Sequence, residues 1–342
     1  MTASHRPAKA MILGCLGQRL SADEKAFYRD EQPWGFILFG RNICEAEQVK
    51  DLVAEMRDTV GGGAHVPVLI DQEGGRVQRI REPIAPRYPS GAQIGALYAA
   101  DREKGLRAAW LLSRLHAFDL YRLGINVDCL PVLDVPIAGA SNVIGDRAYS
   151  NDPHVVAAIG RAAADGLKAG GVLPVMKHIP GHGRGMADSH HDLPVVTVPR
   201  SELEAHDFVP FRALSSELMG MSCHVVYTDI DPDHPASTSR IVTEEIIRTA
   251  IGFEGLLMSD DISMNALKGT IGERAQRIAP VLDVVLHCHG HMDEMKAVAA
   301  AVSELSGKGR SRADAVEQAF ATPDDADEAA LRHEFQSLMA AS

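Results

Sequence analysis

The chain has few cysteines, and their spacing indicates neither a disulfide framework nor a metal cluster. Its five cysteines are scattered over 342 residues, and no two of them form a Cys-x-x-Cys pair. An odd number of cysteines without such a framework is typical of a reducing compartment. We therefore expect a cytoplasmic protein.

Long apolar runs and an excess of basic residues are also missing. No apolar stretch reaches the roughly 18 residues of a membrane span, and Gly14, Gly17 and Gln18 interrupt the apolar residues that follow the basic N-terminal segment. The chain has 34 basic and 46 acidic residues, so its formal net charge is −12. Nucleic-acid binding requires clustered lysine and arginine. We expect no membrane span, no signal peptide and no nucleic-acid partner.

Short apolar runs alternate along the chain with longer segments of helical periodicity. Runs that are continuously apolar, instead of alternating, are typical of strands buried on both faces, and so of a parallel sheet. Eight β-then-α units predict an α/β fold, specifically a single TIM-like (β/α)8 barrel. The eight runs are residues 10–16, 35–39, 66–70, 125–130, 173–176, 218–223, 255–258 and 283–286.

The expected domain is a single catalytic one over residues 1–342, with the barrel at about 10–305 and a helical tail at about 310–342. In the tail, Pro323-Asp324-Asp325 predicts a helix start, and we expect residues 322–342 to pack outside the barrel. A doubly wound open sheet is the alternative, but Gly14-x-x-Gly17 lacks the usual form of its phosphate-binding turn. Helices are expected at 46–60, 106–122, 153–169, 201–216 and 243–251.

Polar residues directly follow five of the eight apolar runs. Barrel enzymes place their catalytic groups at the C-terminal ends of the strands, so we expect these side chains to face one site. They are Asp71, then Lys177 and His178, then Cys223 and His224, then Ser259, Asp260 and Asp261, and finally His287, Cys288 and His289.

The segment 177–191 carries the densest polar chemistry in the chain. It begins with Lys177 and His178, continues through a glycine-rich loop and ends in Asp188-Ser189-His190-His191. Glycines let such a loop reposition its backbone, and an aspartate two residues from a histidine can orient the ring and stabilise its charge. A solvated glycine turn with incidental histidines is the alternative. The cluster favours an active-site edge.

Three further segments are ambiguous when each is taken alone. Asp71 at a strand end can bind neighbouring hydroxyls, with Arg79 reaching back to it, or it can cap the next helix. Arg147 can clamp a substrate oxygen or pair with Asp146 in its loop. In 259–261, strand alternation predicts that only one of the two aspartates points into the barrel mouth; that residue is a nucleophile or general base, unless the pair caps a helix.

Together these segments resemble family 3 glycoside hydrolases, and more narrowly the bacterial β-N-acetylhexosaminidases of peptidoglycan recycling. The resemblance runs from about residue 11 to residue 289. The motifs that carry it are Asp-Gln-Glu-Gly-Gly-Arg-Val-Gln-Arg (71–79), Gly-Asp-Arg-Ala-Tyr (145–149), Lys-His-Ile-Pro-Gly-His-Gly (177–183), Ala-Asp-Ser-His (187–190) and Met-Ser-Asp-Asp-Ile-Ser-Met (258–264).

The resemblance implies a TIM-like barrel and a retaining mechanism that releases N-acetylglucosamine from GlcNAc-anhydro-MurNAc peptides. Asp260 would be the nucleophile and His190 the acid/base, with Asp188 as its partner. Neither a metal nor another cofactor is implied, the partner is the small sugar or muropeptide substrate, and we expect a monomer. The residues implied to bind the sugar are Asp71, Arg79, Arg147, Lys177 and His178.

The chain departs from the family pattern before its last strand. Relatives have an Ala-Gly-Cys-Asp-like sequence there, whereas this chain has Ile-Ala-Pro-Val-Leu-Asp at 278–283, with Pro280 and no glycine. We expect the eighth strand to start differently. This end is also rich in histidine, with His289 and His291.

Three alternative readings remain at this point. A substrate acetamido group could act as the nucleophile, with Asp260 steering it. A non-catalytic sugar-binding protein is disfavoured because Asp260 and His190 are both present. A metal-dependent hydrolase on the same barrel has enough nitrogen and oxygen ligands, although no His-x-His follows the first strand. The candidate ligands are Asp71, His178, His182, His190, His224, His287 and His289.

Overall fold

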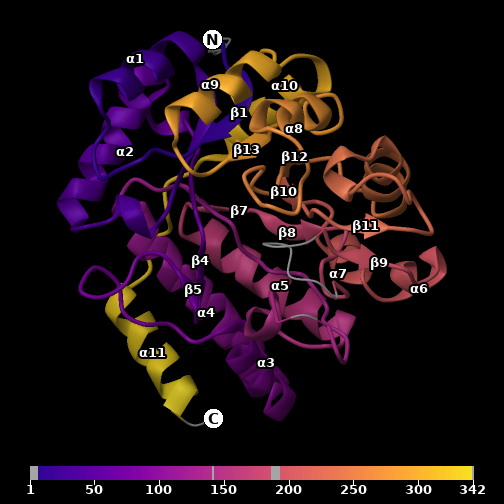
Figure 1. Ribbon diagram of the computed structural model, residues 1–342. Coiled ribbons are helices and arrows are strands. Elements are labelled where there is room, and N and C mark those ends of the chain that lie inside the picture. The colour runs from indigo at the N-terminus through magenta and orange to yellow at the C-terminus, as the bar shows by residue number, and fades with distance from the viewer. Residues whose placement is uncertain (1–6, 141, 186–192, 341–342) are drawn as a thin grey trace.

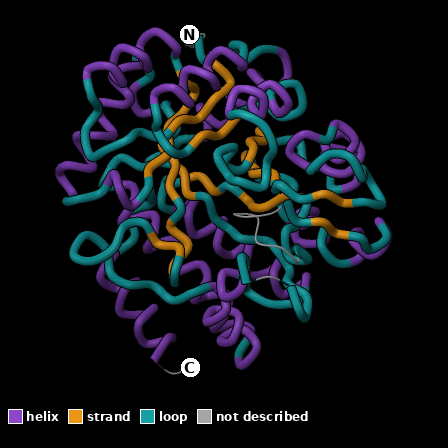
Figure 2. Tube along the Cα trace, viewed as in Figure 1, coloured by secondary structure: helices purple, strands orange, loops and turns teal. Residues whose placement is uncertain are grey.

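The computed structural model describes residues 7–140, 142–185 and 193–340. Its strands gather at the centre, and helices surround them (Figures 1 and 2). The larger sheet has six strands in the order β13-β1-β2-β3-β6-β7, and every pairing in it is parallel. These strands are β1 (Lys9–Leu13), β2 (Pro33–Leu38), β3 (Val68–Ile70), β6 (Val127–Asp128), β7 (Leu173–Pro174) and β13 (Val285–His287).

A second parallel sheet contains β8 (Met176–Ile179), β10 (Met219–Ser222) and β12 (Leu256–Ser259), in the order β12-β10-β8. A single residue separates β7 in the first sheet from β8 in the second. Each of the eight apolar runs overlaps a strand, so the prediction of a parallel α/β sheet is confirmed.

Both faces of the strands are buried, which explains why the runs are apolar without alternation. Ile12, Ile37 and Leu69 belong to one buried cluster. Met11 and Leu13, which flank Ile12 and point to the opposite face, belong to a second cluster that includes side chains of the surrounding helices.

The helices cover the outer faces of the strands (Figure 1). Two of them have the predicted bounds, 46–60 and 153–169. The helices are α1 (Ala22–Glu31), α2 (Ala46–Val60), α3 (Gly91–Ala100), α4 (Arg102–Tyr121), α5 (Pro153–Ala169), α6 (Arg200–Ala205), α7 (Val209–Ala213), a π-helix (Val242–Ala250), α8 (Ile271–Ile278), α9 (Met292–Ala301), α10 (Gly307–Ala319) and α11 (Glu328–Ala340).

The prediction of one helix at 201–216 is wrong. The chain forms two short helices, α6 and α7, separated at residues 206–208. Pro210 lies in the first turn of α7. Proline has no N–H to donate to the carbonyl four residues earlier, and its ring clashes with that carbonyl, so one helix cannot run through Pro210, which instead lies in the first turn of a new helix.

The helix start predicted at Pro323 is also wrong, because α11 begins at Glu328. Asp324 has other partners: its backbone N–H donates to the Ala169 carbonyl at an N···O distance of 3.0 Å, and its carboxylate accepts from the buried guanidinium of Arg114. Asp327 caps the helix instead, accepting from the N–H groups of Ala329 and Ala330.

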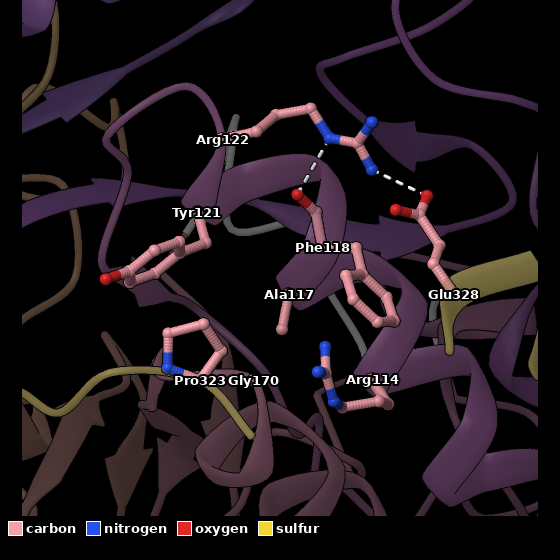
Figure 3. Close-up of a pocket in the computed structure, with 8 residues that line it drawn as sticks. All are labelled: Arg114, Ala117, Phe118, Tyr121, Arg122, Gly170, Pro323 and Glu328. Atoms are coloured by element: carbon pink, nitrogen blue, oxygen red, sulfur yellow. Dashed lines mark hydrogen bonds and ion pairs between the residues drawn. The ribbon is translucent and has the colours of Figure 1, made fainter. Parts of the chain in front are cut away.

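The C-terminal segment packs on the outside of α4. A cavity of about 290 Å³ remains between them, and Arg114 and Phe118 of α4 face it together with Pro323 and Glu328 of the tail (Figure 3). Helix α10 has a different place. Its Ala313 and Val316 belong to the cluster that contains Ile12 and Ile37, and Glu317 accepts a hydrogen bond from the Trp34 indole at 2.8 Å.

None of the described helices combines the length and the apolar character needed to cross a membrane.

Candidate active site

The carboxyl ends of the strands surround a cavity of about 830 Å³. Six of the eight site residues predicted from the sequence line it, although they come from four separate segments of the chain. These six are Asp71, Arg79, Arg147, Lys177, His178 and Asp260. The other two, Asp188 and His190, lie outside the described residues.

Asp71 joins two cations at the floor of the cavity. It directly follows β3, and its carboxylate accepts from Lys177 Nζ at 2.9 Å and from Arg79 Nη2 at 2.9 Å. Arg79 follows a hairpin of β4 (Gln72–Gly74) and β5 (Val77–Gln78), which turns the chain back toward Asp71. Burial alone would raise the pKa of Asp71, but the charges of Lys177 and Arg79 outweigh burial and hold it well below its usual range.

Glu73 is a site residue that the sequence analysis did not single out. Its carboxylate accepts both arms of the Arg147 fork, at 2.8 and 2.7 Å, and lies 2.6 Å from Lys177 Nζ. Burial acts to raise the pKa of Glu73, yet Arg147 and Lys177 lower it to about 2. The available signal was its position two residues after Asp71, because alternate residues of an extended segment share a face.

Lys177 is therefore held by two carboxylates and is almost completely buried. Burial acts to lower the pKa of its ammonium group, but Asp71 and Glu73 more than compensate and raise the pKa above its usual value. The lysine stays charged and acts as a fixed donor, which excludes a role as a general base near neutral pH.

Arg147 does not form the loop ion pair with Asp146 that was the structural alternative. Asp146 accepts from Arg76 at 2.8 Å instead. Arg76 also donates to the carbonyls of Asn142 and Val143. The hydrogen bonds of Arg76 connect the β4–β5 hairpin to the loop that carries Arg147. Arg147 therefore contacts Glu73 from a loop that is stabilised by these bonds.

Asp134 is a second residue that the sequence analysis missed. It is fully buried, and its Oδ2 lies 2.6 Å from Nδ1 of His178. Its Oδ1 accepts from the backbone N–H groups of His178 (3.3 Å) and His182 (2.6 Å). Burial raises and His178 lowers the pKa of Asp134, and the net result is a pKa of about 2. An ionised Asp134 keeps the proton on Nδ1, so Nε2 of His178 remains for a ligand.

Both aspartates after β12 line the cavity, and their carboxylates differ in their contacts. The strand ends at Ser259, and strand alternation does not extend to residues beyond it. Asp261 is engaged by Ser263 (2.5 Å from Oγ) and by the Cys288 N–H (3.2 Å). Asp260 accepts only the N–H of Asp261, at 2.7 Å, among the described residues. Its other carboxylate oxygen has no protein donor there.

The histidines considered as metal ligands are distributed over separate contacts. His178 pairs with Asp134, His224 contacts Ser237 and the Asp261 carbonyl, and His287 pairs with Glu294 at 2.8 Å. Within residues 7–140, 142–185 and 193–340, no three His, Cys, Asp or Glu side chains are arranged to hold a metal ion.

The cavity chemistry agrees with comparisons to known proteins. The chain matches the model of the glycosyl hydrolase family 3 N terminal domain over residues 8–320. It is 38% identical over 315 residues to a β-hexosaminidase of Xylella fastidiosa, covering 87% of this chain and 91% of that protein. A β-hexosaminidase of Xanthomonas campestris pv. campestris is 37% identical, with 87% and 92% covered.

Solved structures give the same assignment. NagZ from Neisseria gonorrhoeae in complex with N-trifluoroacetyl-D-glucosamine superimposes with a TM-score of 0.84 at 32% identity, over 98% of this chain and 97% of that one. A family 3 β-N-acetylglucosaminidase from Paenibacillus has a TM-score of 0.83 at 28% identity, over 96% and 67% of the two chains. The chain therefore belongs to glycosyl hydrolase family 3 and is a glycoside hydrolase.

Proposed function

We propose that this glycoside hydrolase is a retaining exo-β-N-acetylglucosaminidase. The observation that carries the proposal is the convergence of fixed charged donors and acceptors in one cavity with Asp260, whose second carboxylate oxygen accepts from no donor in the described part of the chain. Its volume of about 830 Å³ suits a sugar ligand. The names of the relatives, and the glucosamine derivative bound to the gonococcal protein, support the N-acetylated sugar.

In the proposed binding mode, the sugar hydroxyls contact Asp71, Arg79, Arg147, Lys177 and His178. Lys177 and Arg147 are held in place by Asp71 and Glu73, so their donors need little reorganisation when a sugar binds. The His178 ring is oriented by Asp134 and presents Nε2.

In the first chemical step, a carboxylate oxygen of Asp260 attacks the anomeric carbon while the bond to the leaving oxygen breaks. The protonated ring of His190 gives its proton to that oxygen, and a glycosyl ester on Asp260 forms. In the second step, His190 removes a proton from water, the water oxygen bonds to the anomeric carbon, and Asp260 leaves as a carboxylate. Asp188 would orient the ring and stabilise its charge.

The roles of Asp188 and His190 rest on their positions in the sequence motif. The glycosidase scheme with two carboxylates does not include a histidine acid/base, but imidazole titrates near neutral pH and is suited to both proton transfers.

Hydrolysis of 4-nitrophenyl N-acetyl-β-glucosaminide tests the activity, with Asp260→Ala as the control and a strong chelator in a parallel assay. We expect chelator-resistant release that the substitution abolishes. Release that a chelator abolishes would contradict the proposal and favour a metal-dependent reaction. Adding phosphate to the same assay shows whether water or phosphate accepts the sugar.

A 2-fluoro sugar substrate tests the covalent step. We expect the mass of one glycosyl group on the peptide that contains Asp260. If the enzyme turns over the parent substrate and yet no label forms on Asp260, the substrate's own acetamido group is the better candidate for the nucleophile.

We also propose a physiological substrate and setting: GlcNAc-anhydro-MurNAc peptides, cleaved in the cytoplasm by a monomer. The resemblance to the enzymes of peptidoglycan recycling supports this substrate. Comparing kcat/KM on such a muropeptide with that on chitobiose tests it, and a higher value on chitobiose would contradict it.

Finally, we propose that the two parallel sheets form one closed (β/α)8 barrel and one domain. The near-continuity of β7 and β8 supports closure on one side, and a parallel bridge between Met258 and Val284 supports it on the other. A crystal structure with an open gap between β12 and β13 would contradict it.

A further inference from the structure

The side chain of His182 lines the active-site cavity without a hydrogen-bond partner. Its residue is only 4% exposed, yet neither Nδ1 nor Nε2 has a partner among the described residues. A buried polar atom without a partner costs free energy, so an unpaired ring in a cavity wall indicates a group that a ligand satisfies.

The backbone around His182 is well anchored, which makes a chance orientation of the ring a poor explanation. Its N–H donates to Asp134 at 2.6 Å, and its ring packs edge-on against that of His178, with 6.1 Å between centroids. Gly185 also lies close to the ring, since a Cβ added to it would be 3.1 Å from Cε1 of His182. The ring thus has close neighbours on His178 and Gly185, and neither of its nitrogens is bonded within the described part of the chain.

We propose that His182 is a further substrate-contact residue, whose ring hydrogen-bonds a hydroxyl of the bound sugar beside Asp260; this rests on the proposed function. His182 would thus join the proposed sugar-binding residues Asp71, Arg79, Arg147, Lys177 and His178.

The charge state of the ring suits a hydroxyl. Burial lowers the pKa of His182; the charges of Asp134 and Asp260 act to raise it, and that of His178 acts to lower it. A neutral imidazole has one donor and one acceptor nitrogen, which matches a hydroxyl that both donates and accepts. A carboxylate or phosphate group would find one donor at most.

A double-mutant cycle between enzyme and substrate tests the contact. The substrates are 4-nitrophenyl N-acetyl-β-glucosaminide and its 3-deoxy, 4-deoxy and 6-deoxy analogues, and the variants are His182→Leu and His182→Gln. For the contacted hydroxyl, we expect the wild type to lose about 3- to 12-fold in kcat/KM on removal of that group. On the parent substrate, His182→Leu should lose a similar factor in kcat/KM relative to the wild type. On the analogue that lacks the contacted hydroxyl, the variant and the wild type should have nearly equal kcat/KM. His182→Gln, which keeps a donor and an acceptor, recovers part of the loss.

His116 offers a matched control. Its ring is fully buried, and neither of its nitrogens has a hydrogen-bond partner among the described residues, although Nδ1 lies 4.0 Å from Asp128 Oδ2; unlike His182, it does not line the cavity. His116→Leu should leave the ratios between parent and deoxy substrates as they are in the wild type. Thermal melts of all variants separate loss of fold from loss of contact.

The outcomes distinguish the two proposals. If the wild type cleaves none of the four substrates, the proposed function fails and the contact with it. If the wild type is active and His182→Leu loses the same factor on all four, the contact is absent and His182 acts indirectly. If His182→Leu unfolds, the same cycle is measured with folded His182→Gln. An equal loss of kcat/KM on all four substrates, relative to the wild type, would then overturn the proposal.

Discussion

The carboxylate of Asp134 lies 2.6 Å from Nδ1 of His178 and also accepts the backbone N–H of His182 at 2.6 Å. One buried acid thus orders both histidines of the Lys-His-Ile-Pro-Gly-His-Gly segment. Because Asp134 follows a different strand from these histidines, its contact also connects two neighbouring segments at the mouth of the cavity.

Replacing Asp134 with asparagine should reduce activity more than stability. The amide oxygen can still accept both backbone N–H groups, as Oδ1 does, but the amide nitrogen is a donor and cannot accept the proton on Nδ1 of His178, so the ring loses its acceptor or changes its tautomer. An unsatisfied buried group costs about 1–3 kcal/mol, and we expect a loss of roughly 5- to 150-fold in kcat/KM. Asp283→Asn is the control, because Asp283 accepts from Arg248 and Arg312 away from the cavity. Equal losses of activity in both variants would contradict a specific role for Asp134.

Glu73→Gln should raise KM because Lys177 and Arg147 lose the carboxylate that holds them. Glu217 provides a matched control: it is equally buried and also pairs with an arginine and a lysine, Arg161 and Lys168, but it does not line the cavity. Breaking a buried ion pair costs roughly 3–5 kcal/mol, so both variants should melt at a lower temperature. We expect only Glu73→Gln to raise KM, by about 10-fold or more. A similar KM for the two variants would show that the Glu73 contacts are purely structural.

The same carboxylate predicts a limit to acid stability. The pKa of Glu73 is lowered in the fold from 4.5 to about 2. A depressed pKa stabilises the fold fully above the unfolded value, and this contribution is lost as the pH falls through the folded pKa. The contribution of Glu73 should therefore be present at neutral pH and disappear between about pH 4.5 and pH 2.

Urea unfolding across this pH range measures the effect. The free energy of unfolding should fall less steeply with decreasing pH for Glu73→Gln than for the wild type, because glutamine binds no proton. Parallel curves for the two proteins would rule out the depressed pKa.

The C-terminal helix should support the loop that precedes α3. Arg332 of α11 donates to the Tyr88 hydroxyl at 2.9 Å and to Asp119 at 2.6 Å, and the Tyr88 carbonyl accepts from the Gly75 N–H of the hairpin turn at 3.0 Å. We expect Arg332→Gln to cost about 1–3 kcal/mol and to speed proteolysis of the tail.

Arg107, which pairs α4 with α11, provides the comparison with Arg332. It forms a forked ion pair with Glu334 of α11, but both side chains are exposed. Exposed pairs contribute about 0–1 kcal/mol, so Arg107→Gln should leave the tail almost as resistant as in the wild type. Faster proteolysis of Arg107→Gln than of Arg332→Gln would contradict this order.

The positions of the strands and of several site residues could be read from local patterns. A continuous apolar run needs only its own residues to indicate a buried strand, and a polar residue at its end needs only the parallel arrangement to face the same site. Asp71, Lys177 and Asp260 were identified in this way, and Arg79, Arg147 and His178 by motif. The sequence alone also assigns Asp188 and His190, which lie outside the described residues.

Only the tertiary structure decided which side chains pair with one another in the site. Glu73 and Asp134 became site residues because β3, β6 and β8 bring Lys177, Arg147 and His178 next to them, and no local pattern encodes a contact between residues so far apart in the chain. Asp324 pairs with Arg114 and does not start α11, and the difference between Asp260 and Asp261 depends on Ser263 and Cys288, which contact only the second carboxylate. Periodicity is a property of a segment, whereas an ion pair depends on the packing that brings two segments together.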